Sequence, residues 1–131
     1  MNVLFSLLLI LQGGAVQEQR EFEMPYGDST ITMKRYVMCI YTAGDNRSQN
    51  EEQAMEIQKA HLAHQDVLAD KGLLLVAGPF GGDGDKRGIL IFDVGTVAEA
   101  EPLVKDDPAV KAGRLNYELL EWWTMKGSVI K

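Results

Sequence analysis

The residues best suited to chemistry near neutral pH are the chain's two histidines, His61 and His64. An imidazole has an unperturbed pKa of about 6.5, so it can both take and return a proton under physiological conditions. The two histidines are three positions apart, a spacing that brings side chains together on a helix. One imidazole could therefore act as both general acid and base, and the two together could share a metal ion.

The sequence offers few further ligands for a metal ion. It contains no third histidine, and Cys39 is its only cysteine, so neither a cysteine-rich metal site nor an intrachain disulfide can form. Asp107 would have to supply a third ligand from a distant segment. We therefore expect no metal and no cofactor. Cys39 lies within an apolar run and is expected to be a small buried hydrophobe rather than a reactive thiol.

Both histidines lie on a predicted amphipathic helix that ends at Gly72, a residue suited to a left-handed helix cap. Ser48 is a candidate N-cap for this helix, and acidic residues in its first turn would complement the helix dipole. One stripe of the helix contains Ala54, Ile57, Ala60, His61, His64, Val67 and Leu68. Both imidazoles should therefore point towards the packed side of the helix.

Four segments are predicted to form strands, namely residues 36–41, 73–77, 89–92 and 117–125. The second is a continuous apolar run too short for a helix, which is typical of a buried strand. The glycine-rich segment 78–88 joins it to the third strand. A phosphate-binding loop would open a helix, whereas this segment leads into a strand, so we interpret it as a hairpin loop that could close over a nearby pocket.

Two helix starts follow the third strand. Thr96 and Glu99 have the spacing of a capping box, but Pro102 should kink this helix or make it begin later. In the second start, Asp107 is the expected N-cap and Pro108 the first helical position, and the helix should end at residue 113.

The order strand, helix, strand, strand, helix, strand predicts an α+β protein with the split βαβ pattern of the ferredoxin-like fold. Its four-stranded antiparallel sheet has helices on one face only. The strands are apolar enough that the other face must also be covered, and a second copy of the chain is the simplest cover. We therefore expect a homodimer.

The predicted domain of residues 35–131 follows two other segments. Residues 1–15 have the pattern of a secretory signal peptide, because residues 3–11 are apolar apart from Ser6, and Gly13 and Ala15 are small. No basic residue precedes them, so a start further upstream, or an N-terminal core strand or helix, is the alternative. We expect cleavage and a periplasmic or secreted bacterial protein. Residues 16–34 are an N-terminal extension, predicted to form an edge strand or hairpin.

The charge balance excludes some classes of partner. The chain has 13 basic and 19 acidic residues, a net charge of −6, and its Lys and Arg residues are scattered along the sequence. Neither nucleic acid nor an anionic membrane surface is an expected partner. No segment reaches the roughly 18 apolar residues of a membrane-spanning helix. After cleavage of the leader, the expected partners are a second copy and a small molecule.

Several short motifs occur in a fixed order: Ala60-His61-Leu62-Ala63, residues 72–75, Ala77-Gly78-Pro79, and Asp107-Pro108 followed by Ala112-Gly113. Over about residues 35–126 this set resembles the YciI-like, or YCII-related, family. The resemblance implies a dimeric ferredoxin-like α/β barrel. It also implies an active-site cleft lined by a His and by the Asp of the Asp-Pro motif, and these positions are His61 and Asp107.

What the resemblance implies about activity is broad. A relative removes chloride from a hydroxylated ring, and structurally similar families include muconolactone isomerases and cofactor-free monooxygenases. We predict a cofactor-independent lyase or isomerase for a small cyclic or aromatic organic acid or phenol, with His61 as general acid and base and Asp107 as its orienting partner. The alternatives are a noncatalytic ligand-binding or sensory dimer of the cell envelope, and a structural protein in which His61 is a core residue and Asp107 only a cap.

Overall fold

The computed structural model describes residues 10–12, 15–17 and 19–131, and side chains from residue 19 onwards. It divides into two compact units, Met1–Arg35 with Trp123–Lys131, and Tyr36–Trp122. The predicted signal peptide lies largely outside the described residues, so its cleavage stays a prediction. No helix in the described part of the chain is both long and apolar enough to cross a membrane.

The first unit is built from hairpins. Strands β1 (Ile10–Gln12) and β2 (Ala15–Gln17) pair antiparallel, and β3 (Glu21–Tyr26) pairs with the first half of β4 (Ser29–Ala43). The hairpin predicted before residue 35 is therefore confirmed. Because its first residues pair with β3, β4 begins earlier than the predicted strand 36–41. The ring of Trp123 lies 5.1 Å from that of Phe22.

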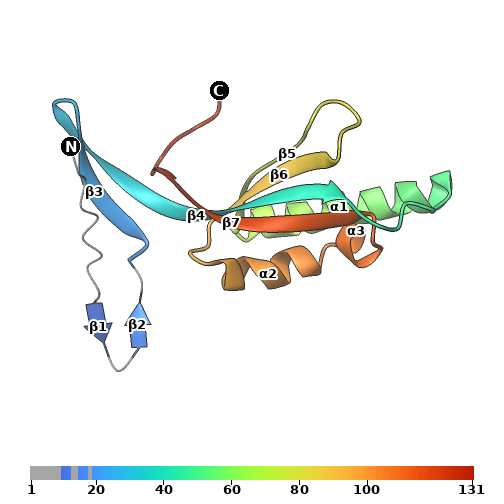
Figure 1. The fold of residues 1–131 in the computed structure, drawn as a ribbon, viewed down its shortest axis with the longest axis horizontal. Coiled ribbons are helices and arrows are strands. Elements are labelled where there is room, and N and C mark those ends of the chain that lie inside the picture. The colour runs from blue at the N-terminus through green and yellow to red at the C-terminus, as the bar shows by residue number, and fades with distance from the viewer. Residues whose placement is uncertain (1–9, 13–14, 18) are drawn as a thin grey trace. The chain divides into compact units, whose positions relative to one another are not determined.

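The sheet of the second unit has the order β7-β4-β6-β5, with β5 at Leu74–Pro79, β6 at Lys86–Phe92 and β7 at Leu115–Met125 (Figure 1). β4 pairs antiparallel with β6, and β6 pairs antiparallel with β5. This is the strand order of the ferredoxin-like split βαβ pattern, so the predicted α+β fold class is confirmed. The sheet is open at β5 and β7.

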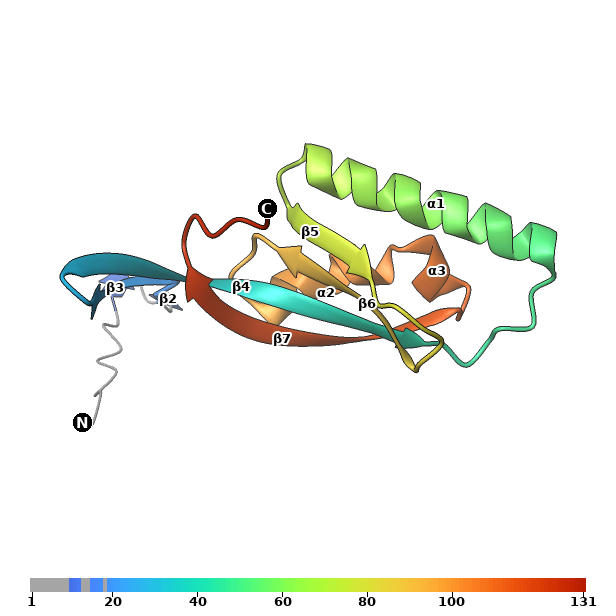
Figure 2. The same ribbon diagram turned by 90° about the horizontal axis from the view of Figure 1, so that it is seen from above.

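Three helices, α1 (Glu51–Asp70), α2 (Val97–Lys105) and α3 (Pro108–Lys111), accompany this sheet (Figure 2). Alternate residues of the central strands pack with residues of α1 and α2 in one core. The buried members are Val37, Cys39, Tyr41, Leu68, Leu74, Leu90, Phe92, Val94, Ala100 and Val104. Because successive strand residues face opposite sides, the helices cover one face of the sheet and leave the other uncovered.

The limits of α1 are set by local hydrogen bonds. Asn50 is its N-cap, because its side chain accepts the Gln53 N–H at 2.8 Å while the Gln53 side chain accepts the Asn50 N–H at 3.0 Å. The expectation of Ser48 as the cap is therefore wrong, since its hydroxyl instead donates to Asn46 at 2.8 Å. Gly72 follows the helix with φ +72°, as predicted.

Two other expectations are corrected. The strand predicted over residues 73–77 is not buried throughout, because β5 is an edge strand with α1 on one side only, and Leu75 is 50% exposed. α2 begins directly after its Thr96 cap and contains Pro102, so the expectation of a later start is wrong. The glycine-rich segment is confirmed as a hairpin loop, since Pro79 pairs with Gly88 across it.

Candidate functional site

Asp107 lies at the start of α3 and has no exposed surface. Its backbone is extended, and its Oδ1 accepts the Ala109 N–H at 2.8 Å. Pro108 occupies the first turn, where its missing N–H is not needed. The helix start predicted from this Asp-Pro pair is confirmed, and the cap places the carboxylate within the core.

The second carboxylate oxygen joins α1 and β4. Asp107 Oδ2 lies 2.7 Å from His61 Nδ1 and accepts the hydroxyl of Tyr41, also at 2.7 Å. The ring centroids of Tyr41 and His61 lie 5.7 Å apart in an edge arrangement. The predicted contact between His61 and Asp107 is therefore present, with Tyr41 as a third member. The catalytic role of the two residues stays a prediction.

The environment of Asp107 keeps its carboxylate charged. Burial by itself would raise the pKa of Asp107, but hydrogen bonds from His61, Tyr41 and the Ala109 backbone outweigh it, and the pKa is lowered. A carboxyl whose pKa is lower in the folded chain stabilises the fold above its unfolded pKa, and this contribution is lost as the pH falls through the folded pKa. Burial, and then Asp107, raise the pKa of the Tyr41 hydroxyl, so Tyr41 stays a neutral donor.

The hydrogen bonds assign the protonation of the His61 ring. A charged carboxylate only accepts, so the proton of a neutral His61 lies on Nδ1 and the lone pair on Nε2. The Gln65 amide nitrogen lies 3.0 Å from Nε2 and donates to it. If Nε2 is protonated, the same amide can turn and present its oxygen. Gln65, one turn along α1, can therefore partner both protonation states.

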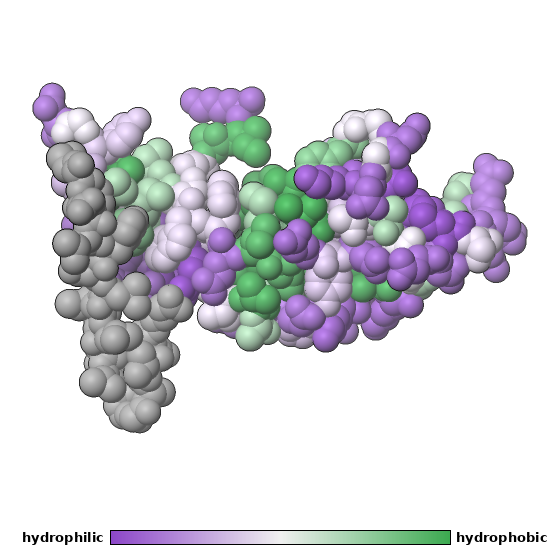
Figure 3. Space-filling model, viewed as in Figure 1, coloured by the Kyte–Doolittle hydropathy of each residue, from purple (hydrophilic) through white to green (hydrophobic). Residues whose placement is uncertain are grey.

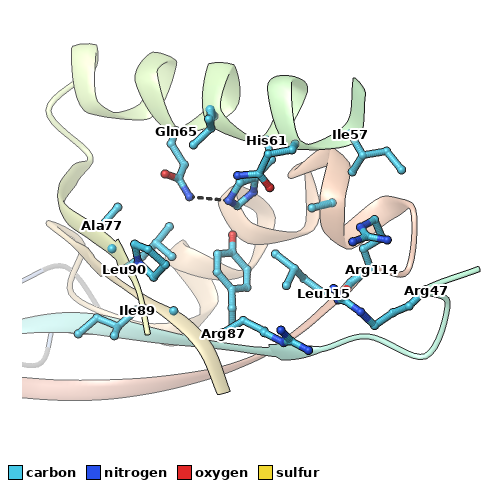
Figure 4. Close-up of a pocket in the computed structure, with 17 residues that line it drawn as sticks. Arg47, Ile57, His61, Gln65, Ala77, Arg87, Ile89, Leu90, Arg114 and Leu115 are labelled. Carbon is cyan, nitrogen blue, oxygen red and sulfur yellow. Dashed lines mark hydrogen bonds between the residues drawn. The ribbon is translucent and has the colours of Figure 1, made fainter. Parts of the chain in front are cut away.

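His61 and Gln65 line a pocket of about 370 Å³ (Figure 4). Tyr41 and Ala109 also contribute to its wall. Apolar residues make up much of the remaining lining, namely Ile57, Leu62, Ala77, Pro79, Ile89, Leu90 and Leu115. A small ring could occupy such a space, with apolar contacts to its faces and polar groups at its edges.

Three arginines line the same pocket: Arg47 after β4, Arg87 in β6 and Arg114 before β7. Arg47 donates to the Arg114 carbonyl at 2.6 Å, and Arg114 donates to the side chain of Gln49 at 2.8 Å. The sequence shows Lys and Arg residues as scattered, but the fold brings these three together.

His64 has a different environment from His61. It is half-buried, its Nε2–H donates to the Leu103 carbonyl at 2.8 Å, and it does not line the pocket. The two histidines therefore have separate partners. Within the described part of the chain, no group of three or more His, Cys, Asp or Glu side chains is placed to hold a metal ion.

Cys39 is fully buried in the core, as predicted. Burial, and then the charge of Asp107, raise the pKa of its thiol to about 12. A thiolate at neutral pH is therefore disfavoured, which confirms the interpretation of Cys39 as a buried hydrophobe rather than a reactive thiol.

Sequence analysis missed Tyr41, Gln65 and the three arginines. Two signals were available. Tyr41 shares its strand face with Val37 and Cys39, so a polar hydroxyl there needed a buried partner. Gln65 follows His61 by four positions, which places the two side chains together on a helix. Nothing local in the sequence joins the arginines.

Fold and pocket together define a small α+β protein in which a buried Tyr-Asp-His group borders a pocket. The chain belongs to the YCII-related family, because the model of the YCII-related domain matches residues 34–123. This agrees with the resemblance found in the sequence.

One solved structure similar to this chain is the 5-chloro-2-hydroxyhydroquinone dehydrochlorinase from Burkholderia phenoliruptrix in complex with 2,5-dihydroxybenzoquinone. The two chains are 28% identical, with a TM-score of 0.49, and the similarity covers 66% of this chain and 92% of that one. No curated protein matches this chain.

Proposed function

We propose that this protein is a cofactor-independent lyase or isomerase that acts on a small cyclic or aromatic compound. The observation that carries the proposal is the position of His61, with a charged, buried carboxylate on Nδ1 and a pocket at the other side of the ring. This arrangement fixes the tautomer that places the lone pair on Nε2, the nitrogen that would act as the base, and it stabilises the imidazolium that forms. Asp107 and Tyr41 are positioning residues.

The proposed reaction begins with transfer of a proton from a substrate carbon or hydroxyl to Nε2 of His61. Gln65 must first release Nε2, to which it donates in the free protein. In an isomerisation, the imidazolium returns the proton to another atom of the ring system. In an elimination, a leaving group departs with its bonding electron pair, and the proton passes later to water. Neither route needs an oxidant or a metal to balance.

The test is turnover of a panel of hydroxylated aromatic compounds and cyclic carboxylic acids by the purified protein, with no added cofactor. Conversion of at least one compound, with no metal requirement, is expected. Compounds that bind without conversion would instead favour the alternative, a noncatalytic ligand-binding or sensory dimer.

We also propose that a second copy covers the open sheet face and completes a dimeric α/β barrel. This face carries Met38, Ile40 and Ile89, which are half-buried, and Leu120 and Trp122, which are 42% and 38% exposed. Figure 3 shows hydrophobic surface gathered over the middle of the sheet. Apolar surface of this kind on a sheet is typical of a protein interface.

The dimer proposal predicts the effect of Trp122→Glu in sedimentation. The wild-type chain should be a dimer at micromolar concentration, and the variant should dissociate with a Kd raised by at least about 30-fold, because it places a charge in the interface. Val67→Glu is the control, since Val67 is 49% exposed on α1, away from this face. A wild-type monomer with no binding of an apolar dye would contradict the proposal.

Export is a separate proposal, supported by the apolar leader and the small residues after it. Protein recovered from the native bacterial host should have lost residues 1–15 and should begin at Val16. Intact-mass measurement checks this, and a mass that retains Met1 would overturn the proposal.

A further inference from the structure

The arginine cluster, defined as Arg47, Arg87 and Arg114, is not used by the proposed proton transfer. All three side chains line the pocket that contains His61. In the close-up they lie together towards one end, while Gln65 and Ala77 lie towards the other (Figure 4). The pocket therefore has a basic end, and His61 lies between this end and the end with Gln65 and Ala77.

No carboxylate is directly paired with this cluster in the described part of the chain. No Asp or Glu is among the residues that line the pocket, and within the described ranges none of the three arginines forms an ion pair. The Nε–H of Arg87 is buried without a hydrogen-bond partner in the same part of the chain. A buried donor of this kind is costly unless a ligand pairs with it.

The fold holds these like charges together. The Gly44 N–H donates to the Arg114 carbonyl at 2.8 Å, and the Asn46 N–H donates to the Gly113 carbonyl at 2.9 Å. The approach is so close that a Cβ at residue 44 would lie 2.1 Å from the Gly113 oxygen. Desolvation, followed by the charges of Arg114 and Arg87, lowers the pKa of Arg47. The fold therefore holds three positive charges close together, and a bound anion would relieve the repulsion between them.

We propose that the arginine cluster binds an oxyanion group, a carboxylate or a phosphate, carried by a ring compound whose opposite edge faces His61. Guanidinium groups pair with both kinds of oxyanion through two parallel hydrogen bonds. Ile57, which lies towards the basic end, and Leu115, which lies between His61 and the arginines, both line the pocket and can contact the ring (Figure 4). The inference rests on the proposed function for the role of His61, and it narrows the substrate to an organic anion.

The first experiment compares two probes of similar shape, the anion 4-hydroxybenzoate and the neutral 4-hydroxybenzamide, by calorimetric titration of the full chain. The acid should bind at least about tenfold more tightly than the amide, as expected for a charge-assisted pair. Added salt should weaken binding of the acid and leave the amide nearly unchanged. Phenyl phosphate and benzoate, run in parallel, show which oxyanion the cluster prefers.

The second experiment removes one charge at a time. Arg47→Met, Arg87→Met and Arg114→Met should each weaken binding of the acid by about tenfold or more and change binding of the amide by less than about twofold. Lys59→Met, on the exposed surface of α1, removes the same charge outside the pocket and should have no effect. Arg47 is exposed, so its variant should fold even if the half-buried Arg87 does not tolerate replacement.

The inference would be overturned if the acid and the amide bound equally tightly. It would also be overturned if the ratio of their dissociation constants stayed the same in all three arginine variants. A third contradicting result is that the arginine variants no longer dimerise but still prefer the acid to the amide. The arginine cluster would then contact the partner subunit rather than a ligand. These outcomes are separate from the proposed activity. Tight binding of the acid without turnover would support the anion site and contradict the proposed enzymatic activity. Turnover of neutral phenols alone would support the activity and contradict the anion site.

Discussion

His61→Ala is expected to lower kcat/KM for any compound that the protein converts by about 10²- to 10⁴-fold, the usual contribution of a general acid or base. The imidazole nitrogen that faces the pocket is lost, and the chain's other histidine does not line the pocket. The measurement is steady-state kinetics on a compound converted by the wild-type chain. Circular dichroism at the assay temperature checks that the variant is folded.

His64→Ala is the matched control for this prediction. His64 is on the same helix, and its Nε2–H donates one hydrogen bond within the fold, to the Leu103 carbonyl. The variant should lose about 1 kcal/mol of unfolding free energy and keep its activity within about twofold. If both variants lose activity equally, or if His61→Ala keeps full activity, His61 is a structural residue and the proposed function fails.

The fold could be predicted from local patterns because each element is specified by short-range physics. The Gly72 cap, the Thr96 cap and the helical stripe of α1 depend only on residues within a few positions of one another, although Val67, predicted in that stripe, is 49% exposed. Errors arose where a pairing partner was not visible in the local sequence. β4 begins early because β3 lies beside it, and β5 is partly exposed because it is an edge strand.

The candidate site was predicted only in part, for the same reason. His61 and Asp107 are 46 positions apart, and the family resemblance, not a physical rule, joined them. Tyr41 is 66 positions from Asp107 and was expected only as part of an apolar strand. The arginine cluster depends on the loop after β4, the start of β6 and the turn before β7, which come together at one pocket. Composition and residue spacing carry no information about such contacts between distant segments.

Asp107 shows why its structural and functional roles were difficult to separate from sequence. An Asp before a Pro is explained by helix capping alone, worth about 1 kcal/mol. The structure shows that the two roles use different atoms, because Oδ1 accepts the Ala109 N–H while Oδ2 accepts from Tyr41 and His61. A substitution that keeps the cap and changes Oδ2 can therefore distinguish them.

Asp107→Asn is that substitution, and it is expected to lower kcat/KM by about 10³- to 10⁴-fold while costing only about 1 kcal/mol of stability. The Asn oxygen can still cap α3, and its amide then donates to His61 Nδ1. The ring proton moves to Nε2, so the nitrogen that faces the pocket can no longer act as a base. The hydroxyl of Tyr41 can rotate to accept from the same amide, which keeps the buried groups paired.

Two further measurements test whether Asp107→Asn acts in this way. Tyr41→Phe removes one donor and leaves the His61 contact, so it should lower kcat/KM by less than about tenfold. The difference in unfolding free energy between wild type and Asp107→Asn should shrink as the pH falls below about 4. The hydrogen bonds that lower the pKa of Asp107 stabilise its charged form, and this stabilisation is lost when the carboxylate is protonated. If activity and stability instead fall together by a similar free energy, Asp107 is only a cap. A kcat/KM that survives Asp107→Asn would show that the orientation of His61 does not depend on the carboxylate.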